Sequence, residues 1–490
     1  MNPSTLNAGL VAVLPEILLL ILAFVVMGAD LVLAGPAKRV LGRVTIVGLL
    51  IILVVDLMLP AAGSVFGGMI YVDGWVALFR MLFLSAALLV CFLSLDAKEL
   101  PQNGEYYGLL IFATMGMSLM AAARDLIMLY VAIETTSITL YLLAGFLRGS
   151  YRSAEAGLKY FLFGAFASTI MLYGFSVLYG LTHSTGYDAI AQVLTQFGSN
   201  PDSAFRWLVM APLLLVMVGF GFKISAVPFH FWTPDVYEGA PTPVTAFISV
   251  ASKAAGFAVL VRFLMAVYPV ARTEWVALLS ALSVVTMTLG NGLALVQHNV
   301  KRMLAYSSIA QAGYMLIGVV SVANPDVAPY GPTAVLFYLG VYLLTNVAGF
   351  AIVIAVTNAL GTEEISGMAG LSRRSLGLAL AMLAVMLSLG GVPPLAGFFA
   401  KLYVFAAAMG QGLTWLVVVG VLNSILSLYY YLMVVKYIFV DRSEGDEQPM
   451  RVAPALNFGL WVAAAGILIL GVFATPWYTL ADQAVKIARF

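Results

Sequence analysis

Residues 376–409 read LGLALAMLAVMLSLGGVPPLAGFFAKLYVFAAAM, a long apolar run that Gly390-Gly391-Val392-Pro393-Pro394 interrupts near its middle. Residues 207–238 form a second long apolar run, interrupted at Val227-Pro228. A membrane span needs about 20 apolar residues, and proline removes a backbone donor and clashes with the preceding turn. Each run therefore predicts one span broken partway, which a bilayer tolerates only where protein or water satisfies the freed backbone groups.

The composition indicates that the whole chain, and not only these two runs, lies in a membrane. Of 490 residues, 62% are hydrophobic and 10% are charged, whereas soluble proteins average about 25% charged residues. A soluble enzyme is therefore excluded, and a net charge of +1 leaves no basic surplus for nucleic acid. Residues 1–20 contain no Lys or Arg, so the basic segment of a cleaved signal peptide is missing and the first span is expected to be retained.

Apolar runs between charged residues or Gly/Pro-rich breaks predict about fourteen spans in a single polytopic membrane domain, 1–490. The runs are continuous rather than alternating, which argues against a β-barrel. The connections are mostly short, so we expect no inserted soluble domain. The spans are expected near 9–33, 43–60, 75–95, 106–123, 125–147, 156–180, 207–238, 242–268, 274–295, 302–322, 332–358, 376–409, 412–438 and 455–478.

The two broken spans, the seventh and the twelfth, indicate an internal repeat. They are five spans apart, and an odd shift inverts a copy in the membrane. We therefore expect an all-α integral membrane protein with two inverted five-helix repeats, spans 4–8 and 9–13, each containing a broken helix. The expected parts are peripheral spans 1–3 in 1–100, the first repeat in 105–268, the second in 274–438, and the last span with a C-terminal tail in 455–490.

Lysine and arginine are unevenly divided between the two sets of loops. Thirteen lie on the side that begins with the loop after the first span, and five lie on the other side. Because cytoplasmic loops carry the excess of Lys and Arg, we expect both termini to be extracytoplasmic. The five cations of the poorer side are Arg124, Arg206, Arg272, Lys486 and Arg489.

Cysteine and histidine are too sparse for a redox or metal centre. Cys91 stands alone, so no disulfide can form within the chain, and an iron–sulfur cluster takes four protein ligands. The histidines, His183, His230 and His298, are far apart and show no metal-ligand spacing. We therefore expect this chain to hold no cofactor and no metal.

Four charged residues lie where the hydrocarbon core is expected: Glu134, Lys223, Lys253 and Lys401. A charge at the bilayer centre costs about 2.5–3.5 kcal/mol on insertion scales, so such residues usually face a protein or water-filled interior and serve a function. Glu134 and Lys253 lie deep in their spans, where a side chain cannot easily reach the interface. Lys223 and Lys401 adjoin the broken backbone, where local hydration is expected.

Other polar residues are secondary candidates. Lys159, near the start of its span, can extend to the interface or pair with Glu155 one turn earlier. His230 and His298 can relay protons, because histidine titrates near neutral pH, but each can equally be an ordinary polar residue at a helix end. Arg80 is expected to anchor an interface or to tie spans together.

Buried lysines of this kind suit proton transfer. Desolvation disfavours the charged form of a lysine and a nearby carboxylate favours it, so a lysine exchanges its proton as a partner moves or is neutralised. A row of lysines linked by water can pass charge across a membrane. Moving one charge against 100 mV costs about 2.3 kcal/mol. The sequence shows no fuel site, so a partner must supply that energy.

Three stretches resemble the antiporter-like membrane subunits of proton-pumping NADH–quinone oxidoreductase, respiratory complex I. Within that family, the chain length and Lys401 resemble the N type, since the L type has a lateral helix and the M type usually carries Glu at that position. The similarity in layout covers nearly the whole chain. The stretches are GFKISAVPFHFWTPDVYEGAPTPVTAFISVASKAAG at 221–256, HNVKRMLAYSSIAQAGYMLIG at 298–318 and LSRRSLGLALAMLAVMLSLGGVPPLAGFFAKLYVF at 371–405.

The resemblance implies a subunit of the bacterial inner membrane that moves protons while partner subunits oxidise NADH and reduce quinone. FMN, iron–sulfur clusters and quinone would lie in those partners. Glu134 and Lys223 would form an ion pair, Lys253 would connect the two halves, and Lys401 would be the terminal lysine of the second half-channel.

The resemblance also implies that Lys159 and Glu155 modulate transport. In span 10, Ser307, Ser308 and Gln311 occur, but no carboxylate faces the place that Glu134 has in span 5. The two halves are therefore not expected to be chemically equal.

Two other functions remain open. A subunit of a multisubunit cation/proton antiporter has the same motifs without a redox partner, and the chain length and Lys401 favour the oxidoreductase over it. Co-purification with flavin and iron–sulfur subunits would separate these two. A non-pumping scaffold would tolerate neutralisation of all the buried lysines.

Overall fold

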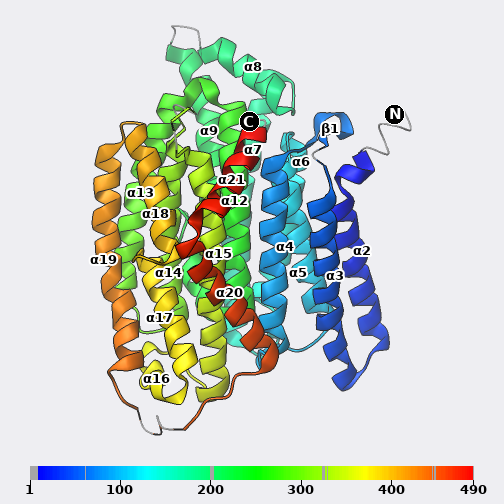
Figure 1. The fold of residues 1–490 in the computed structure, drawn as a ribbon. Coiled ribbons are helices and arrows are strands. Elements are labelled where there is room, and N and C mark those ends of the chain that lie inside the picture. Colours follow the sequence, from blue (N-terminus) through cyan, green and yellow to red (C-terminus); the bar gives the residue numbers. More distant parts are fainter. Residues whose placement is uncertain are drawn as a thin grey trace.

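The chain is an elongated bundle of long helices in the computed structural model, which describes residues 9–60, 62–198, 203–322, 326–327, 329–443, 445, 448–488 and 490. Arg489, which contributed to the predicted orientation, lies outside the described residues. Figure 1 shows α2 (Leu14–Val32) and α3 (Arg39–Met58) at one flank and α19 (Thr414–Phe439) at the other.

The helices match the fourteen predicted spans one for one. Twelve stretches of the described chain are long and apolar enough to cross a membrane. The two other spans are α5 and the pair α17–α18, whose halves are short. Besides α2, α3 and α19, the helices concerned are η1 (Gly35–Lys38), α4 (Gly74–Leu95), α5 (Gly104–Ala122), α6 (Leu126–Ala144), α7 (Tyr151–Thr182), α9 (Ser203–Ile224), α10 (Trp232–Gly239), α11 (Thr242–Phe247), η3 (Ile248–Ser252), α12 (Lys253–Val267), η4 (Pro269–Ala271), α13 (Arg272–Ala294), α14 (Val300–Val320), α15 (Gly331–Leu360), α17 (Leu376–Gly390), α18 (Ala396–Gly410) and α20 (Pro454–Val472).

The two broken spans are interrupted where the prolines predict. Pro228 lies between α9 and α10, and Pro393 and Pro394 lie between α17 and α18. A backbone hydrogen bond of 2.9 Å lies at each break. At the first, the amide of Ala226 donates to the carbonyl of Gly221, and at the second, the amide of Val392 donates to the carbonyl of Leu387. Protein groups thus satisfy backbone atoms that a bilayer could not.

The centre of the bundle consists of the continuous span α11–α12 together with α14 and α15. Their most apolar windows are 94–100% buried within the chain, whereas those of the flanking helices α2 and α7 are 33% buried. Polar side chains on the central helices therefore face other helices and not lipid.

Arg80 of α4 ties the first spans together, as expected. Its guanidinium donates to Glu16 of α2 at 2.8 and 2.9 Å, to Ser118 of α5 at 3.2 Å, and lies 3.6 Å from Asp56 of α3. These groups are almost fully buried. The cluster holds four helices by charge and hydrogen bonds at one flank of the bundle.

Smaller elements at the ends of the bundle were not predicted. A hairpin of β1 (Gly63–Val65) and β2 (Ile70–Val72), with η2 (Phe66–Gly68) between them, and the helix α8 (Tyr187–Gly198) lie at the end of the bundle where α2 begins and α21 ends (Figure 1). The opposite end has η5 (Ile365–Met368) and α16 (Leu371–Arg374). That end contains the cation-rich loops, and we call it the cation-rich end.

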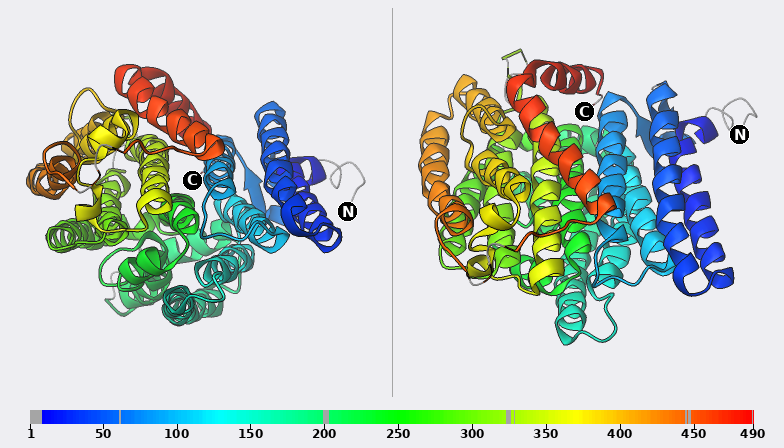
Figure 2. Two further views of the ribbon diagram at one scale, coloured as in Figure 1. Left: turned by 90° about the horizontal axis from the view of Figure 1, so that it is seen from below. Right: turned by 60° about the horizontal axis from the view of Figure 1, so that its bottom comes forward.

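The chain closes with α21 (Ala474–Ile487), which runs on from α20 over the outer surface of the bundle (Figure 2). Trp477 donates to the carbonyl of Phe337 on α15 at 3.3 Å, and a Cβ at Gly340 would lie 2.4 Å from its ring. Phe490 packs its ring edge-on against Trp75 of α4 at 5.1 Å. The predicted last span, 455–478, is therefore two helices, of which only α20 is long enough to span.

Candidate functional site

Lys223 lies one residue before the end of α9, at the first break, and is 5% exposed. Its Nζ donates to Ser137 Oγ of α6 over 2.6 Å. Gly256 brings α12 close to it, since a Cβ on that glycine would lie 3.2 Å from the Cβ of Lys223. Three helices thus fix this lysine in the first half of the bundle.

Glu134 precedes Ser137 by one turn on α6 and remains partly exposed. Its carboxylate accepts a hydrogen bond from Ser168 Oγ of α7. The direct ion pair that the family resemblance implies is not formed between these described residues. Lys223 instead reaches Ser137, so serine hydroxyls occupy the positions next to both charges.

Lys159 belongs to a charged cluster at the cation-rich end. Its Nζ lies 2.8 Å from Glu155, in the one-turn pair that the sequence allowed, and 2.6 Å from Asp235 of α10. Arg302 of α14 lies 2.7 Å from Asp235 and 3.0 Å from Glu238. Four of these residues line a cavity of about 190 Å³, which places the cluster in contact with solvent.

Lys253 connects the two halves of the bundle. It is 1% exposed, and its Nζ donates to the carbonyl of Ser308 on α14 at 2.6 Å and also to Ser308 Oγ. The hydroxyls of Ser308 and Tyr237 are 3.2 Å apart. The π-helical turn η3, Ile248–Ser252, immediately precedes Lys253. Such turns are often found at functional sites.

Uncharged polar groups continue from this contact toward the second break. Ser307, the neighbour of Ser308, bonds the hydroxyl of Tyr431 at 2.5 Å. Gln311 Nε2 donates to the same hydroxyl at 3.2 Å and to the carbonyl of Leu389 at 3.1 Å. Ser307, Ser308 and Gln311 are the polar residues noted in span 10, where the sequence has no carboxylate, and all three lie on this buried route.

Lys401 of α18 ends the route. It is 5% exposed, and its Nζ donates to the carbonyl of Gly390 at 3.0 Å and to Ser424 Oγ of α19 at 2.8 Å. It also lies 4.6 Å from the centre of the Tyr314 ring. Gly391 has φ +80°, and a Cβ there would lie 2.8 Å from Lys401 Cδ, so glycine gives the lysine room to reach back to the break.

The two candidate histidines are placed differently. His230 lies between α9 and α10, is 3% exposed, and its Nδ1 has no hydrogen-bond partner among the described residues. His298 is exposed just before α14, and its carbonyl accepts from the amide of Ile365 at 2.8 Å. The structure thus leaves His298 outside the buried route from Lys253 to Lys401.

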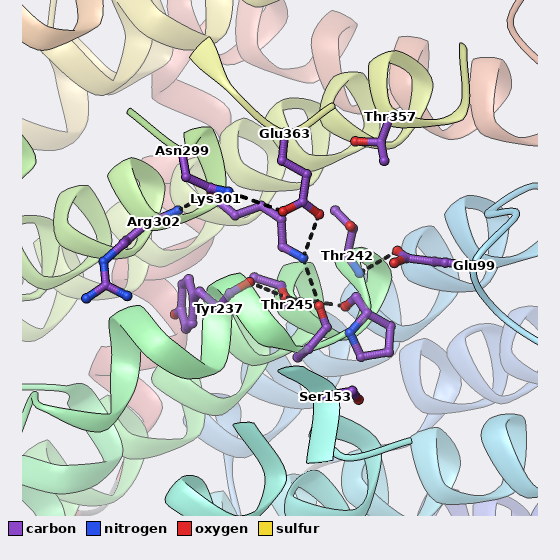
Figure 3. A network of polar contacts seen from close by, with 12 residues as sticks. Glu99, Ser153, Tyr237, Thr242, Thr245, Asn299, Lys301, Arg302, Thr357 and Glu363 are labelled. Atoms are coloured by element: carbon purple, nitrogen blue, oxygen red, sulfur yellow. Dashed lines mark hydrogen bonds and ion pairs between the residues drawn. The ribbon is translucent and has the colours of Figure 1, made fainter. Parts of the chain in front are cut away.

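The ionic partners in the loops of the cation-rich end were not predicted from the sequence. Figure 3 shows the network around Lys301, whose Nζ lies 3.2 Å from Glu363 and donates to the carbonyl of Ala240 at 2.8 Å. Glu99 accepts a bond from the amide of Thr242 at 2.7 Å in the same network. Charges outside apolar runs look like ordinary loop residues. The only sequence signal for this network is the occurrence of charged clusters in two loops, HNVKR at 298–302 and GTEE at 361–364.

A further buried ion pair fixes the other end of α12. Arg262 is 1% exposed and donates to both carboxylate oxygens of Asp73 at 2.7 and 2.6 Å. Asp73 also caps α4 by accepting from the amide of Val76 at 3.1 Å. The C-terminal half of α12, the helix that carries Lys253, is therefore fixed to the start of α4.

The three buried lysines Lys223, Lys253 and Lys401 share one property. Lys223, Lys253 and Lys401 all bond to hydroxyl or carbonyl oxygens, and within the described ranges none is joined to a carboxylate. A buried charge without a counterion is costly, and the hydroxyl and carbonyl oxygens that surround these lysines can accept hydrogen bonds from an ammonium group. Proton exchange is the chemistry that this arrangement supports.

Comparisons with known proteins agree with this geometry. Residues 123–427 match the family model described as NADH:quinone oxidoreductase/Mrp antiporter, TM. The chain is 40% identical to NADH-quinone oxidoreductase subunit N 2 of Chloroherpeton thalassium, over 98% of this chain and 96% of the relative. It is 42% identical to NADH-quinone oxidoreductase subunit N of Moorella thermoacetica, over 94% of this chain and 95% of the relative.

Solved structures give the same fold. A chain of respiratory complex I from Thermus thermophilus is 34% identical, with a TM-score of 0.79 over 96% of this chain and 99% of that chain. A chain of the Mrp complex from Dietzia sp. has a TM-score of 0.82 over 98% of this chain and 97% of that one. At 22% identity, this second likeness concerns the fold alone.

Proposed function

Because the chain belongs to the NADH:quinone oxidoreductase/Mrp antiporter family of membrane subunits, we propose that it is the proton-translocating N-type subunit of an NADH:quinone oxidoreductase. Partner subunits oxidise NADH and reduce quinone, and they hold the FMN, the iron–sulfur clusters and the quinone. Identity of about 40% over nearly the full length of N-type subunits supports this function over a cation/proton antiporter.

One observation carries the proposal: buried polar groups lie between Lys253 and Lys401 in the second half. The route runs from Ser308 through Ser307, Tyr431 and Gln311 to the carbonyls beside the second break. Hydroxyl and amide groups with ordered water can conduct protons between lysines that have no counterion. In the first half, Glu134, Lys223 and the charged cluster of Lys159 are the corresponding exchange groups.

Proton uptake or release per NADH oxidised, in vesicles reconstituted with the purified complex, tests the function directly. The complex should also co-purify with flavin and iron–sulfur subunits, identified by mass spectrometry. A complex with neither subunit, in which a cation gradient drives proton movement, would assign the chain to a cation/proton antiporter instead.

Loss of either charge of the first half should reduce pumping more than assembly. For Glu134→Ala and Lys223→Ala, we expect about a tenfold or greater loss of proton flux through this chain, because a positioned proton-transfer group contributes at least that much. Thr135→Ala is the matched control, since among the described residues Thr135 Oγ1 bonds only to the carbonyl of Val131 on its own helix, at 2.8 Å. Normal pumping by both single variants at normal complex levels would contradict the role.

Orientation can be tested independently. A reporter joined after Phe490 through a flexible linker should behave as extracytoplasmic, because the opposite end of the bundle carries the excess of Lys and Arg in its loops. A second reporter inserted after Arg442 should behave as cytoplasmic. Cytoplasmic signal from the first reporter in an assembled complex would reverse the assignment.

A further inference from the structure

A cavity of about 340 Å³ opens at the cation-rich end, beside the start of α14. An excess of one charge in a cleft with low-dielectric walls attracts ions of the opposite sign. The lining therefore favours protonated water over anions, because its carboxylates outnumber its cations. The charged residues of the lining are Glu99, Glu238, Glu363 and Glu364 against Arg152 and Lys301.

Lys301 forms the inner wall of this cavity and is 1% exposed. Its Nζ donates to the carbonyl of Ala240, just after α10, and lies 3.2 Å from Glu363, whose side chain is 21% exposed. Asn299 holds the second oxygen of Glu363 at 3.3 Å (Figure 3). The carboxylate thus connects a buried ammonium group to the solvent-exposed side of the cavity.

Inward of Lys301, the same face of α14 leads to the connecting lysine. Ser308 follows Lys301 by two helical turns, about 10 Å along the axis. Tyr237 and Thr245 lie between them: Thr245 Oγ1 is 3.5 Å from the carbonyl of Ala240 and 3.0 Å from that of Tyr237, and the Tyr237 hydroxyl is 3.2 Å from Ser308 Oγ. Polar atoms therefore occupy the space between Lys301 and the Ser308–Lys253 contact.

We propose that Lys301 takes up protons from this cavity, with Glu363 as its exchange partner, and delivers them to Lys253. This inference rests on the proposed function. One proton and no electron moves in each step. Protonated water in the cavity becomes water as the Lys301 amine becomes ammonium, and the amine is restored when the proton passes through the hydroxyls of Tyr237 and Ser308, with water between them, to the Lys253 amine.

A structural role for Lys301 predicts a different result. A fixed positive charge would only hold the Ala240 carbonyl and Glu363 in place. Arginine would keep that charge and could keep both bonds, but it does not release its proton. The two roles therefore give opposite outcomes for Lys301→Arg.

The first experiment measures protons moved per NADH by the whole complex in reconstituted vesicles. Lys301→Arg and Lys301→Met should each lower the proton flux through this chain by about tenfold or more. Lys436→Met is the matched control, since Lys436 lies at the same end, is 55% exposed and is 3.4 Å from Asp441. It should pump normally.

Normal pumping by Lys301→Arg would overturn the inference. The variant Lys253→Met separates this failure from failure of the proposed function. If Lys253→Met loses pumping while both Lys301 variants keep it, the proposed function of the chain is supported and proton uptake by Lys301 is contradicted. If all of these variants pump normally, the proposed function falls as well.

A second experiment does not depend on assembly of the Lys301 variants. Thr357→Cys places a thiol in the cavity wall, and the native Cys91 is fully buried. A bulky membrane-impermeant thiol reagent should then reduce the proton flux through this chain by about tenfold or more, as expected for loss of a proton relay. Gln297→Cys lies in a neighbouring cavity without Lys301 and should be insensitive. Complete modification of Thr357→Cys with unchanged pumping would contradict uptake through this cavity.

Discussion

Replacing Lys253 with methionine should stop proton transfer between the two halves of the subunit. Methionine has nearly the same length and fits an apolar site, so the helix should remain packed while the ammonium group at the contact with Ser308 is lost. A positioned proton-transfer group contributes about 10²–10⁴-fold, so we expect the flux through this chain to fall about a hundredfold. The proton-to-NADH ratio of the complex should drop by at least the share that this subunit carries.

The comparison with arginine gives the reason for the loss. Lys253→Arg keeps a positive charge but holds its proton, so it should fail like methionine if Lys253 is a carrier. Lys98→Met is a suitable control, because the Nζ of Lys98 bonds the carbonyl of Asn358 at the cation-rich end and lies outside the route. Wild-type ratios for Lys253→Met in an intact complex would show that the central lysine carries no protons.

The second large effect is expected at Lys401. Apart from tyrosine, it is the only ionisable side chain in α17 and α18. Lys401→Ala removes it and also the bonds to Gly390 and Ser424 beside the break. We expect the flux through the second half to fall about a hundredfold.

Lys401→Arg distinguishes a carrier from a fixed charge. A guanidinium group stays protonated, so arginine should not rescue the loss seen with alanine. Ser424→Ala removes one hydrogen bond and leaves the lysine, so it should have a smaller effect than either change at Lys401. If Lys401→Arg pumps normally, Lys401 is a permanent countercharge and the second half conducts protons in another way.

The broken spans and the buried lysines could be predicted because both conflict locally with a bilayer. Proline within an apolar run and a charge far from either end of a span are visible without any knowledge of tertiary structure. The fourteen-span fold followed from the length and continuity of the apolar runs. Glu155 and Lys159 could be paired because a one-turn spacing on a helix fixes their geometry.

Other parts of the site depend on contacts between distant segments. Lys301 and Glu363 are 62 residues apart and meet only because α14 begins, and α15 ends, at the same side of the bundle. Side-chain conformation decides that Lys223 bonds Ser137 and that Glu134 bonds Ser168. Spacing along a helix cannot distinguish these partners from a direct ion pair.

Relatives that lack the π-helical turn before Lys253 will show this lysine displaced by one position in an alignment without gaps. Each amide in such a turn bonds a carbonyl five residues earlier, so the turn contains one residue more than an α-helical turn. One residue corresponds to a rotation of about 100° around a helix, which would move the lysine to another face. Absence of the connecting lysine from a homologue is therefore meaningful only after a single-residue gap within 248–252 has been considered.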